Sequence, residues 1–252
     1  MTGHALAQNF AAGTISLRNV TKVFRAGDNS VAAVKDVNLE IAPGSFIAIT
    51  GPSGSGKSTL LDLIGGLERP TAGGLTVGDR ALDRLSEQDL ALYRLRQIGF
   101  VFQAFHLIPN LTVFNNVALP GLLAGEPSAR LRDRVMLLLG TMGVEDQNDK
   151  LPHQLSGGQQ QRVAVARALI NDPPMILADE PTGNLDSESG QAVLQLLQIL
   201  HNGGKTLLLV THDPAVAAQA EGRIVMHDGA ATFSARLEKP SISPQSSAGS
   251  VA

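Results

Sequence analysis

Short segments made up mostly of apolar residues recur along the chain, with stretches of helical character between them. Four of these segments lie at residues 45–50, 98–102, 174–178 and 206–211. They lack the alternation of a half-exposed strand, and such runs suit strands that are buried on both faces of a mostly parallel sheet. Helices between buried strands indicate a layered α/β fold.

Two regions depart from this rhythm. Residues 14–20 and 31–41 alternate apolar and polar side chains and are separated by a turn sequence, which predicts a β-hairpin and an antiparallel β subdomain. Residues from about 104 to 155 are mostly helical. We therefore expect an inserted α-helical subdomain at about 104–170.

Composition narrows the class of protein. The chain has 252 residues, 43% of them hydrophobic, which is enough for one large domain with a smaller insertion. The formal net charge of −3 gives no electrostatic reason to expect nucleic acid as a partner. Cysteine is absent, which excludes disulfides and thiolate metal sites.

The two ends of the chain differ from the rest. Residues 1–13 lack the basic and apolar regions of a secretory signal, so we expect an N-terminal extension there. Residues 235–252 are rich in proline and serine and are expected to form a disordered tail. The folded domain is then assigned to 14–233. No apolar run approaches the roughly 18 residues that would span a bilayer, so work at a membrane would require a partner.

A glycine-rich loop follows the first buried strand and fits the phosphate-binding pattern GxxxxGK[ST]. Gly54 and Gly56 leave no Cβ in the way of a phosphate. Lys57 supplies a cation for the β- and γ-phosphates, and the Ser58 hydroxyl is placed to ligate Mg²⁺. A chance turn is the alternative, and the expected strand–loop–helix context argues against it. The expected nucleotide-binding residues of this loop are Gly51, Pro52, Ser53, Gly54, Ser55, Gly56, Lys57, Ser58 and Thr59.

Two carboxylates, Asp179 and Glu180, end the apolar run at 174–178. Taken alone, they could simply leave the strand for solvent. Beside a bound Mg²⁺–nucleotide, Asp179 would orient the metal and its waters, and Glu180 would act as general base toward the attacking water.

A second glycine-rich loop, Leu155 followed by Ser156, Gly157, Gly158 and Gln159, runs into a helix and offers further backbone N–H groups to an anion. One chain with two phosphate-seeking loops suggests a nucleotide that is held from two sides by two copies of the chain.

These motifs resemble those of ABC-type ATPases, in the family's order, over residues 14–233. The resemblance implies a P-loop NTPase core, ATP and Mg²⁺ as ligands, and a head-to-tail dimer. It gives Gln103 contacts to Mg²⁺ and the attacking water, and it makes His212 a switch histidine near the γ-phosphate, neutral or protonated. Asp186 would lie along the dimer interface, although it could equally cap the next helix.

Phe24 stands where the family more often has tyrosine. It could stack on adenine, a contact of ~1–3 kcal/mol by analogy with base–aromatic stacking. A core or hairpin phenylalanine is an equally good interpretation.

A narrower resemblance is carried by residues 65–71, 99–109, 116–120 and 177–186. These are similar to the lipoprotein-release, macrolide-efflux and cell-division branch. That branch implies a membrane permease subunit with few transmembrane helices, and a peripheral position at the cytoplasmic face of the inner membrane. Residues near 102–120 would form the groove for that partner.

Two functions stay open at this stage: powering export or lipoprotein extraction, or signalling across the membrane without cargo. Soluble ABC proteins of DNA repair or translation usually carry two nucleotide domains or long coiled coils, and this sequence shows neither.

Overall fold

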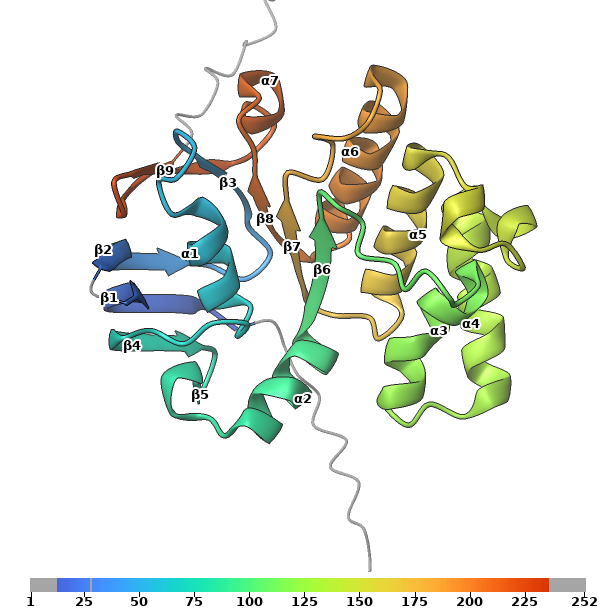
Figure 1. Cartoon of the computed structure of the whole chain (residues 1–252), viewed down its shortest axis with the longest axis horizontal. Helices are drawn as coiled ribbons and strands as arrows, with labels where there is room; N and C mark the ends of the chain where they lie inside the picture. The colour runs from blue at the N-terminus through green and yellow to red at the C-terminus, as the bar shows by residue number, and fades with distance from the viewer. Residues whose placement is uncertain (1–12, 28, 236–252) are drawn as a thin grey trace, which may run out of the picture.

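The computed structural model describes residues 13–27 and 29–235, which form two β-sheets covered by helices (Figure 1). The predicted extension at 1–13 and tail at 235–252 lie outside these residues, apart from Gly13 and Ala235.

Six strands form the central sheet, in the order β10-β9-β3-β8-β7-β6. Five of them pair in parallel, and β10 is antiparallel to β9. The four predicted buried strands are confirmed, each within one residue at its ends. The six strands are β3 (Phe46–Thr50), β6 (Ile98–Phe102), β7 (Met175–Asp179), β8 (Thr206–Val210), β9 (Gly222–His227) and β10 (Ala230–Ala235).

An antiparallel sheet with the order β2-β1-β4-β5 lies beside the central sheet. The predicted hairpin is confirmed, but its first strand is longer than the predicted 14–20. Register shifts in β1 between Leu17 and Val23 interrupt the alternation of side chains. The alternating pattern of the sequence therefore stops at residue 20, before the strand ends. The strands are β1 (Ile15–Ala26), β2 (Asn29–Ile41), β4 (Ala72–Val77) and β5 (Arg80–Ala81).

Helices cover both faces of the central sheet, and α3, α4 and α5 form the helical insertion between β6 and β7. In this insertion α3 and α4 pack on α5, which itself lies against β6. The fold class is thereby confirmed, while the boundaries 14–233 and 104–170 stay predictions. The helices are α1 (Lys57–Ile64), α2 (Glu87–Gln97), α3 (Val113–Leu123), α4 (Ser128–Thr141), α5 (Gly157–Leu169), α6 (Ser187–Asn202) and α7 (Pro214–Ala217), with short 3₁₀ turns η1 (Leu82–Arg84), η2 (Glu145–Gln147) and η3 (Pro152–Gln154).

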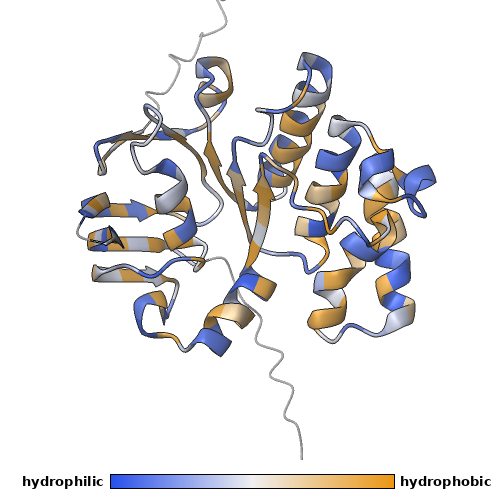
Figure 2. Cartoon of the chain, viewed as in Figure 1, coloured by the Kyte–Doolittle hydropathy of each residue, from blue (hydrophilic) through white to orange (hydrophobic). Residues whose placement is uncertain are grey.

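Two apolar cores lie on opposite faces of the central sheet, whose strands are almost continuously apolar (Figure 2). In β3, Phe46 and Ala48 enter the core beneath α5 and α6, whereas Ile47 and Ile49 enter the core shared with α1 and the antiparallel sheet. Burial on both faces explains why β3 shows no alternation.

None of the described helices is both long enough and apolar enough to span a membrane, and the longest of them, α6, has 16 residues.

Candidate nucleotide-binding and catalytic site

The loop between β3 and α1 has a backbone that only glycine can adopt at two positions. Gly51 and Gly56 have φ of 145° and 101°. A Cβ at Gly51 would lie 2.2 Å from the carbonyl oxygen of Met226, and one at Gly56 would lie 2.0 Å from that of Ala33. The loop therefore packs closely against the backbone of β2 and β9, and only glycine fits at these two positions.

The start of α1 brings a cation, a hydroxyl and a carboxylate together. Lys57 is 9% exposed, and its ammonium donates to the carbonyls of Gly51 (3.1 Å) and Pro52 (2.9 Å). The Ser58 hydroxyl hydrogen-bonds the Asp179 carboxylate from β7. Because Gly56, the residue that caps α1, has no side chain to accept a hydrogen bond, the first N–H groups of the helix remain available to an anion.

A cavity of about 430 Å³ lies over this loop. It unites residues from the ends of β3, β6 and β7, because the carboxyl ends of parallel strands share one edge of the sheet. Ala33 of β2, which the sequence did not indicate, also reaches it through the hairpin that crosses the loop. The lining residues are Ala33, Ser53, Gly54, Gly56, Lys57, Ser58, Thr59, Gln103, Asp179 and Glu180.

Glu180 follows β7 in a strained conformation. Its φ is 44°, a region that costs energy for a residue with a side chain. Its N–H donates to the carbonyl of Val210 on β8, and its carboxylate lies 3.2 Å from Nδ1 of His212, which follows β8. The pair thus joins the ends of two neighbouring strands at the rim of the cavity.

Asp179 sits in a mixed electrostatic environment. Burial raises its pKa, the hydrogen bond from Ser58 lowers it, the neighbouring Glu180 raises it and Lys57 lowers it. A cation beside this carboxylate would relieve both the burial and the repulsion between the two acids.

Gln103 leaves the end of β6 and meets the loop that follows Glu180. Its Nε2 lies 3.4 Å from Oδ1 of Asn184, and Nδ2 of Asn184 donates to the carbonyl of Gln103. A Cβ on Gly183 would lie 2.6 Å from Nε2 of Gln103, so glycine there permits the contact. No role was predicted for Asn184, and the only signal in the sequence is its place in the loop before Asp186.

Ser156 and Gln159 cap α5 in a reciprocal capping box: Gln159 N–H donates to the Ser156 hydroxyl, and Ser156 N–H donates to the Gln159 amide. Residues 156–159 do not line the cavity over the phosphate loop of their own chain.

Asp186 caps α6 by accepting from Ser189 N–H (2.9 Å), and this bond lowers the pKa of Asp186. Its predicted capping role is therefore present.

Phe24 is 41% exposed, so the interpretation as a core residue is excluded. It lies in the hairpin opposite Val31, and the Lys22 ammonium lies 4.9 Å from the centre of its ring. An exposed ring on the hairpin that crosses the phosphate loop remains available for stacking.

Asp62 of α1 leads to a prediction about stability. Its pKa is raised from 3.8 to about 6, mainly by burial and then by repulsion from the carboxylates of Asp179 and Glu68. The folded state therefore holds the proton more tightly, and stability falls as pH rises from about 4 to about 6. The shift corresponds to ~3 kcal/mol, which partial exposure reduces to about 1 kcal/mol.

Asp62→Asn should consequently stabilise the protein by about 1 kcal/mol near pH 7.5 and leave it unchanged near pH 4. Urea unfolding at both pH values, without nucleotide or Mg²⁺, measures this. A gain of equal size at both pH values would contradict the electrostatic explanation.

A phosphate loop between the parallel strand β3 and helix α1, with acidic residues at the end of β7 on the same edge of the sheet, defines a P-loop nucleotide-binding domain. The family model of the ABC transporter matches residues 34–183. The chain belongs to this family and carries its ATPase domain.

Similar proteins support this assignment. The chain is 47% identical over 219 residues to the macrolide export ATP-binding/permease protein MacB of Rhodopseudomonas palustris (strain HaA2), covering 87% of this chain and 34% of that protein. It is 46% identical over 215 residues to the MacB protein of Hahella chejuensis, covering 85% and 33%. The chain therefore spans about a third of the length of these curated relatives.

Solved structures agree. The dimeric structure of a bacterial ABC transporter cassette superposes with a TM-score of 0.83 at 45% identity, covering 88% of this chain and 98% of that one. A dimeric post-hydrolysis state of the same cassette, bound to ADP and Pi, superposes equally well at 44% identity.

Proposed function

We propose that the chain hydrolyses Mg²⁺-ATP between two of its copies and drives a membrane-embedded partner. The observation that carries this proposal is the arrangement of Lys57, Ser58, Asp179, Glu180 and Gln103 around one cavity at the edge of the sheet.

In the proposed reaction, the Glu180 carboxylate accepts a proton from the water that attacks the γ-phosphorus. The bond from the γ-phosphorus to the β–γ bridging oxygen breaks, and the β-phosphate leaves on ADP. Lys57 offsets the charge on the phosphates, and Gln103 and His212 orient the water and the γ-phosphate. The hydrogen-bond distance between His212 and Glu180 supports their joint role.

The donor set fits Mg²⁺. Ser58 offers a hydroxyl, Asp179 a carboxylate and Gln103 an amide oxygen, which are the hard oxygen ligands that this ion prefers. The described residues contain no cluster of three or more His, Cys, Asp or Glu side chains able to hold a metal. The nucleotide phosphates would supply further oxygen ligands, and the ion would offset their negative charge.

In the proposed dimer the two chains pair head to tail. Ser156, Gly157, Gly158 and Gln159 of one chain would then face the ATP on the phosphate loop of the other, with the N-terminus of α5 toward the γ-phosphate. Asp186 would lie along that interface, and Phe24 would stack on adenine. Residues 156–159 do not line the cavity of their own chain, and this supports the pairing because a second chain can supply these groups.

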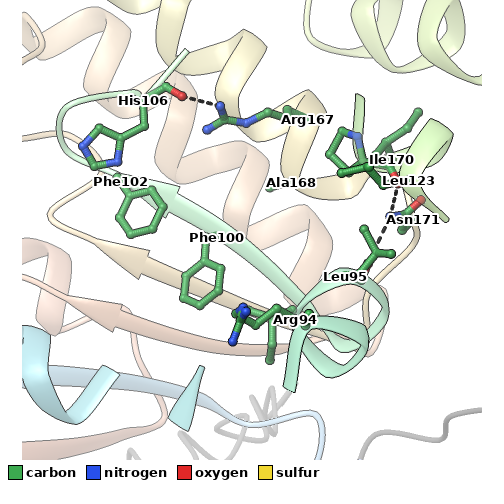
Figure 3. A pocket seen from close by; sticks show the side chains of 13 residues that line it. Arg94, Leu95, Phe100, Phe102, His106, Leu123, Arg167, Ala168, Ile170 and Asn171 are labelled. Carbon is green, nitrogen blue, oxygen red and sulfur yellow. Dashed lines mark hydrogen bonds between the residues drawn. The ribbon is translucent and has the colours of Figure 1, made fainter. Parts of the chain in front are cut away.

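The proposed contact with the partner is a second cavity, of about 410 Å³, between α2, β6, α3 and α5 (Figure 3). Phe100 and Phe102 of β6 stack in its floor with 5.4 Å between ring centres. Leu123 of α3 lines its edge and is 69% exposed. Such an apolar hollow fits a short amphipathic helix from a loop of the partner.

We assign the partner to the permease class with few transmembrane helices, at the inner membrane, with this chain on the cytoplasmic face. Export or lipoprotein extraction is the favoured process, because the MacB relatives are named macrolide export proteins. The alternative is a signalling module of the cell-division type, which rests on the same resemblance of residues 65–71, 99–109, 116–120 and 177–186 to that branch.

Affinity purification of the Glu180→Gln protein from detergent-solubilised membranes with ATP, followed by mass spectrometry, tests the proposal. A few-helix membrane subunit recovered with lipoprotein or efflux partners supports export. Recovery with septal or cell-wall hydrolase regulators supports signalling. Recovery of only soluble ribosomal or DNA-repair proteins overturns both.

Leu123→Arg in the same background should reduce recovery of the membrane subunit by about tenfold or more, because a cation would be placed in an apolar contact. Leu137→Arg on α4 is the matched control, since Leu137 is also 69% exposed but lies outside the cavity. Its recovery should be unchanged. Equal losses in both variants would contradict the placement of the contact.

A further inference from the structure

The backbone strain of the described residues is concentrated next to the proposed catalytic groups. Seven residues other than glycine have positive φ, and four of them are Asn or Asp, which visit this region most readily. The others are Phe105 and His106 (58° and 49°), just after Gln103, and Glu180 (44°). Strain of this kind persists only where surrounding contacts hold it in place.

Two side chains of α5 hold these segments. Gln161 is completely buried, and its Nε2 donates to the carbonyls of Phe102 (3.3 Å) and Pro181 (2.7 Å). Phe102 immediately precedes Gln103, and Pro181 immediately follows Glu180. One amide group therefore connects the backbones of two proposed catalytic residues that are 77 positions apart.

Arg167, six residues further along α5, completes the arrangement. Its guanidinium is partly buried and donates to the carbonyls of the two strained residues, Phe105 and His106. Figure 3 shows the bond to His106. It also lines the cavity between α2, β6, α3 and α5.

The side-chain amide of Gln161 is oriented at a cost to stability. Its Oε1 is buried and has no hydrogen-bond partner among the described residues. A buried unpaired acceptor is costly, and its retention calls for an explanation such as strain or function. When Nε2 donates to both carbonyls, the orientation of the amide leaves Oε1 buried without a hydrogen-bond donor.

We infer that Gln161 is a positioning residue for ATP hydrolysis, which sets Glu180 and Gln103 relative to each other from α5. It acts through their backbones and touches no substrate. Since Ser156 caps the start of α5, movement of that helix on dimerisation would reach both catalytic residues through this one side chain. The inference rests on the proposed roles of Glu180 and Gln103.

Gln161→Met keeps the length of the side chain but removes both donors, so Glu180 should lose its alignment. The expected result is a fall in kcat of about tenfold to a hundredfold, because small misplacements have effects of that size. The Kd for ATP should stay within about twofold, since no phosphate contact is lost. The matched control is Gln147→Met, which removes another buried glutamine, whose amide donates to the neighbouring Asp146. Its kcat should be unchanged.

A double-mutant cycle separates positioning from general damage. In the Glu180→Gln background, Gln161→Met should lower residual single-turnover hydrolysis by less than about twofold, because groups acting as a unit are non-additive. If the methionine variant is not recovered folded, Gln161→Asn replaces it, being one methylene too short to reach both carbonyls.

Two results would overturn the inference: wild-type kcat in either Gln161 variant, or the same fold loss in both backgrounds. Failure of the underlying roles looks different, since Glu180→Gln itself would then hydrolyse ATP at the wild-type rate.

Discussion

The Glu180→Gln protein should bind ATP as tightly as the wild type and lose multiple-turnover hydrolysis by roughly 10²- to 10⁴-fold, the usual contribution of a general base. The amide preserves the size of the side chain but cannot accept the proton of the attacking water. The strained backbone of Glu180 and its contact with His212 place this carboxylate at the rim of the cavity. Steady-state phosphate release, with ATP binding measured separately, checks the expectation.

Glu87→Gln is the matched control for this prediction. Glu87 lies on α2, pairs with Arg69 and is 81% exposed, so its neutralisation should leave hydrolysis unchanged. Wild-type hydrolysis by Glu180→Gln would remove Glu180 from the role of base.

Lys57→Ala should weaken ATP binding by roughly 10²-fold or more, because hydrogen bonds to charged groups contribute about 1.5–3 kcal/mol each and two phosphates are contacted. Lys57 is nearly buried, and its ammonium already lies within the loop, on the carbonyls of Gly51 and Pro52. Little further ordering is needed for it to meet a phosphate. Equilibrium titration with a fluorescent ATP analogue measures the loss.

Lys205→Ala is a suitable control, because Lys205 is also partly buried and also donates to a backbone carbonyl, that of Pro173. Its side chain lies outside the cavity over the phosphate loop, so ATP affinity should be unchanged. Equal affinities for wild type and Lys57→Ala would contradict the assigned role of Lys57.

Four strands of the central sheet were predictable from sequence, because burial on both faces leaves a run of apolar residues, as in β3 and β8, whereas β9 and β10 were not predicted. The candidate site was also largely predictable. Its residues follow those strands directly, so the rule that parallel strands end at one edge brings Lys57, Asp179 and Gln103 together.

The features that escaped prediction depend on contacts between distant segments. The register shifts in β1 interrupt the alternation of apolar and polar residues, so that alternation could not indicate the full length of the strand. Asn184 contacts Gln103 across 81 positions, and Gln161 reaches Phe102 across 59. In the sequence Gln161 is one of three consecutive glutamines, and only the packing of α5 against β6 distinguishes it from its neighbours.

The most direct test of the central claim is the mass of the Glu180→Gln protein in solution, by light scattering, with and without Mg²⁺-ATP. We predict a monomer without nucleotide and a dimer that retains two ATP molecules with it. The dimer should be lost when Ser156→Arg is added, although each chain still binds ATP. A protein that stays monomeric with ATP bound, or a dimer that is indifferent to Ser156→Arg, would contradict a nucleotide held between two chains.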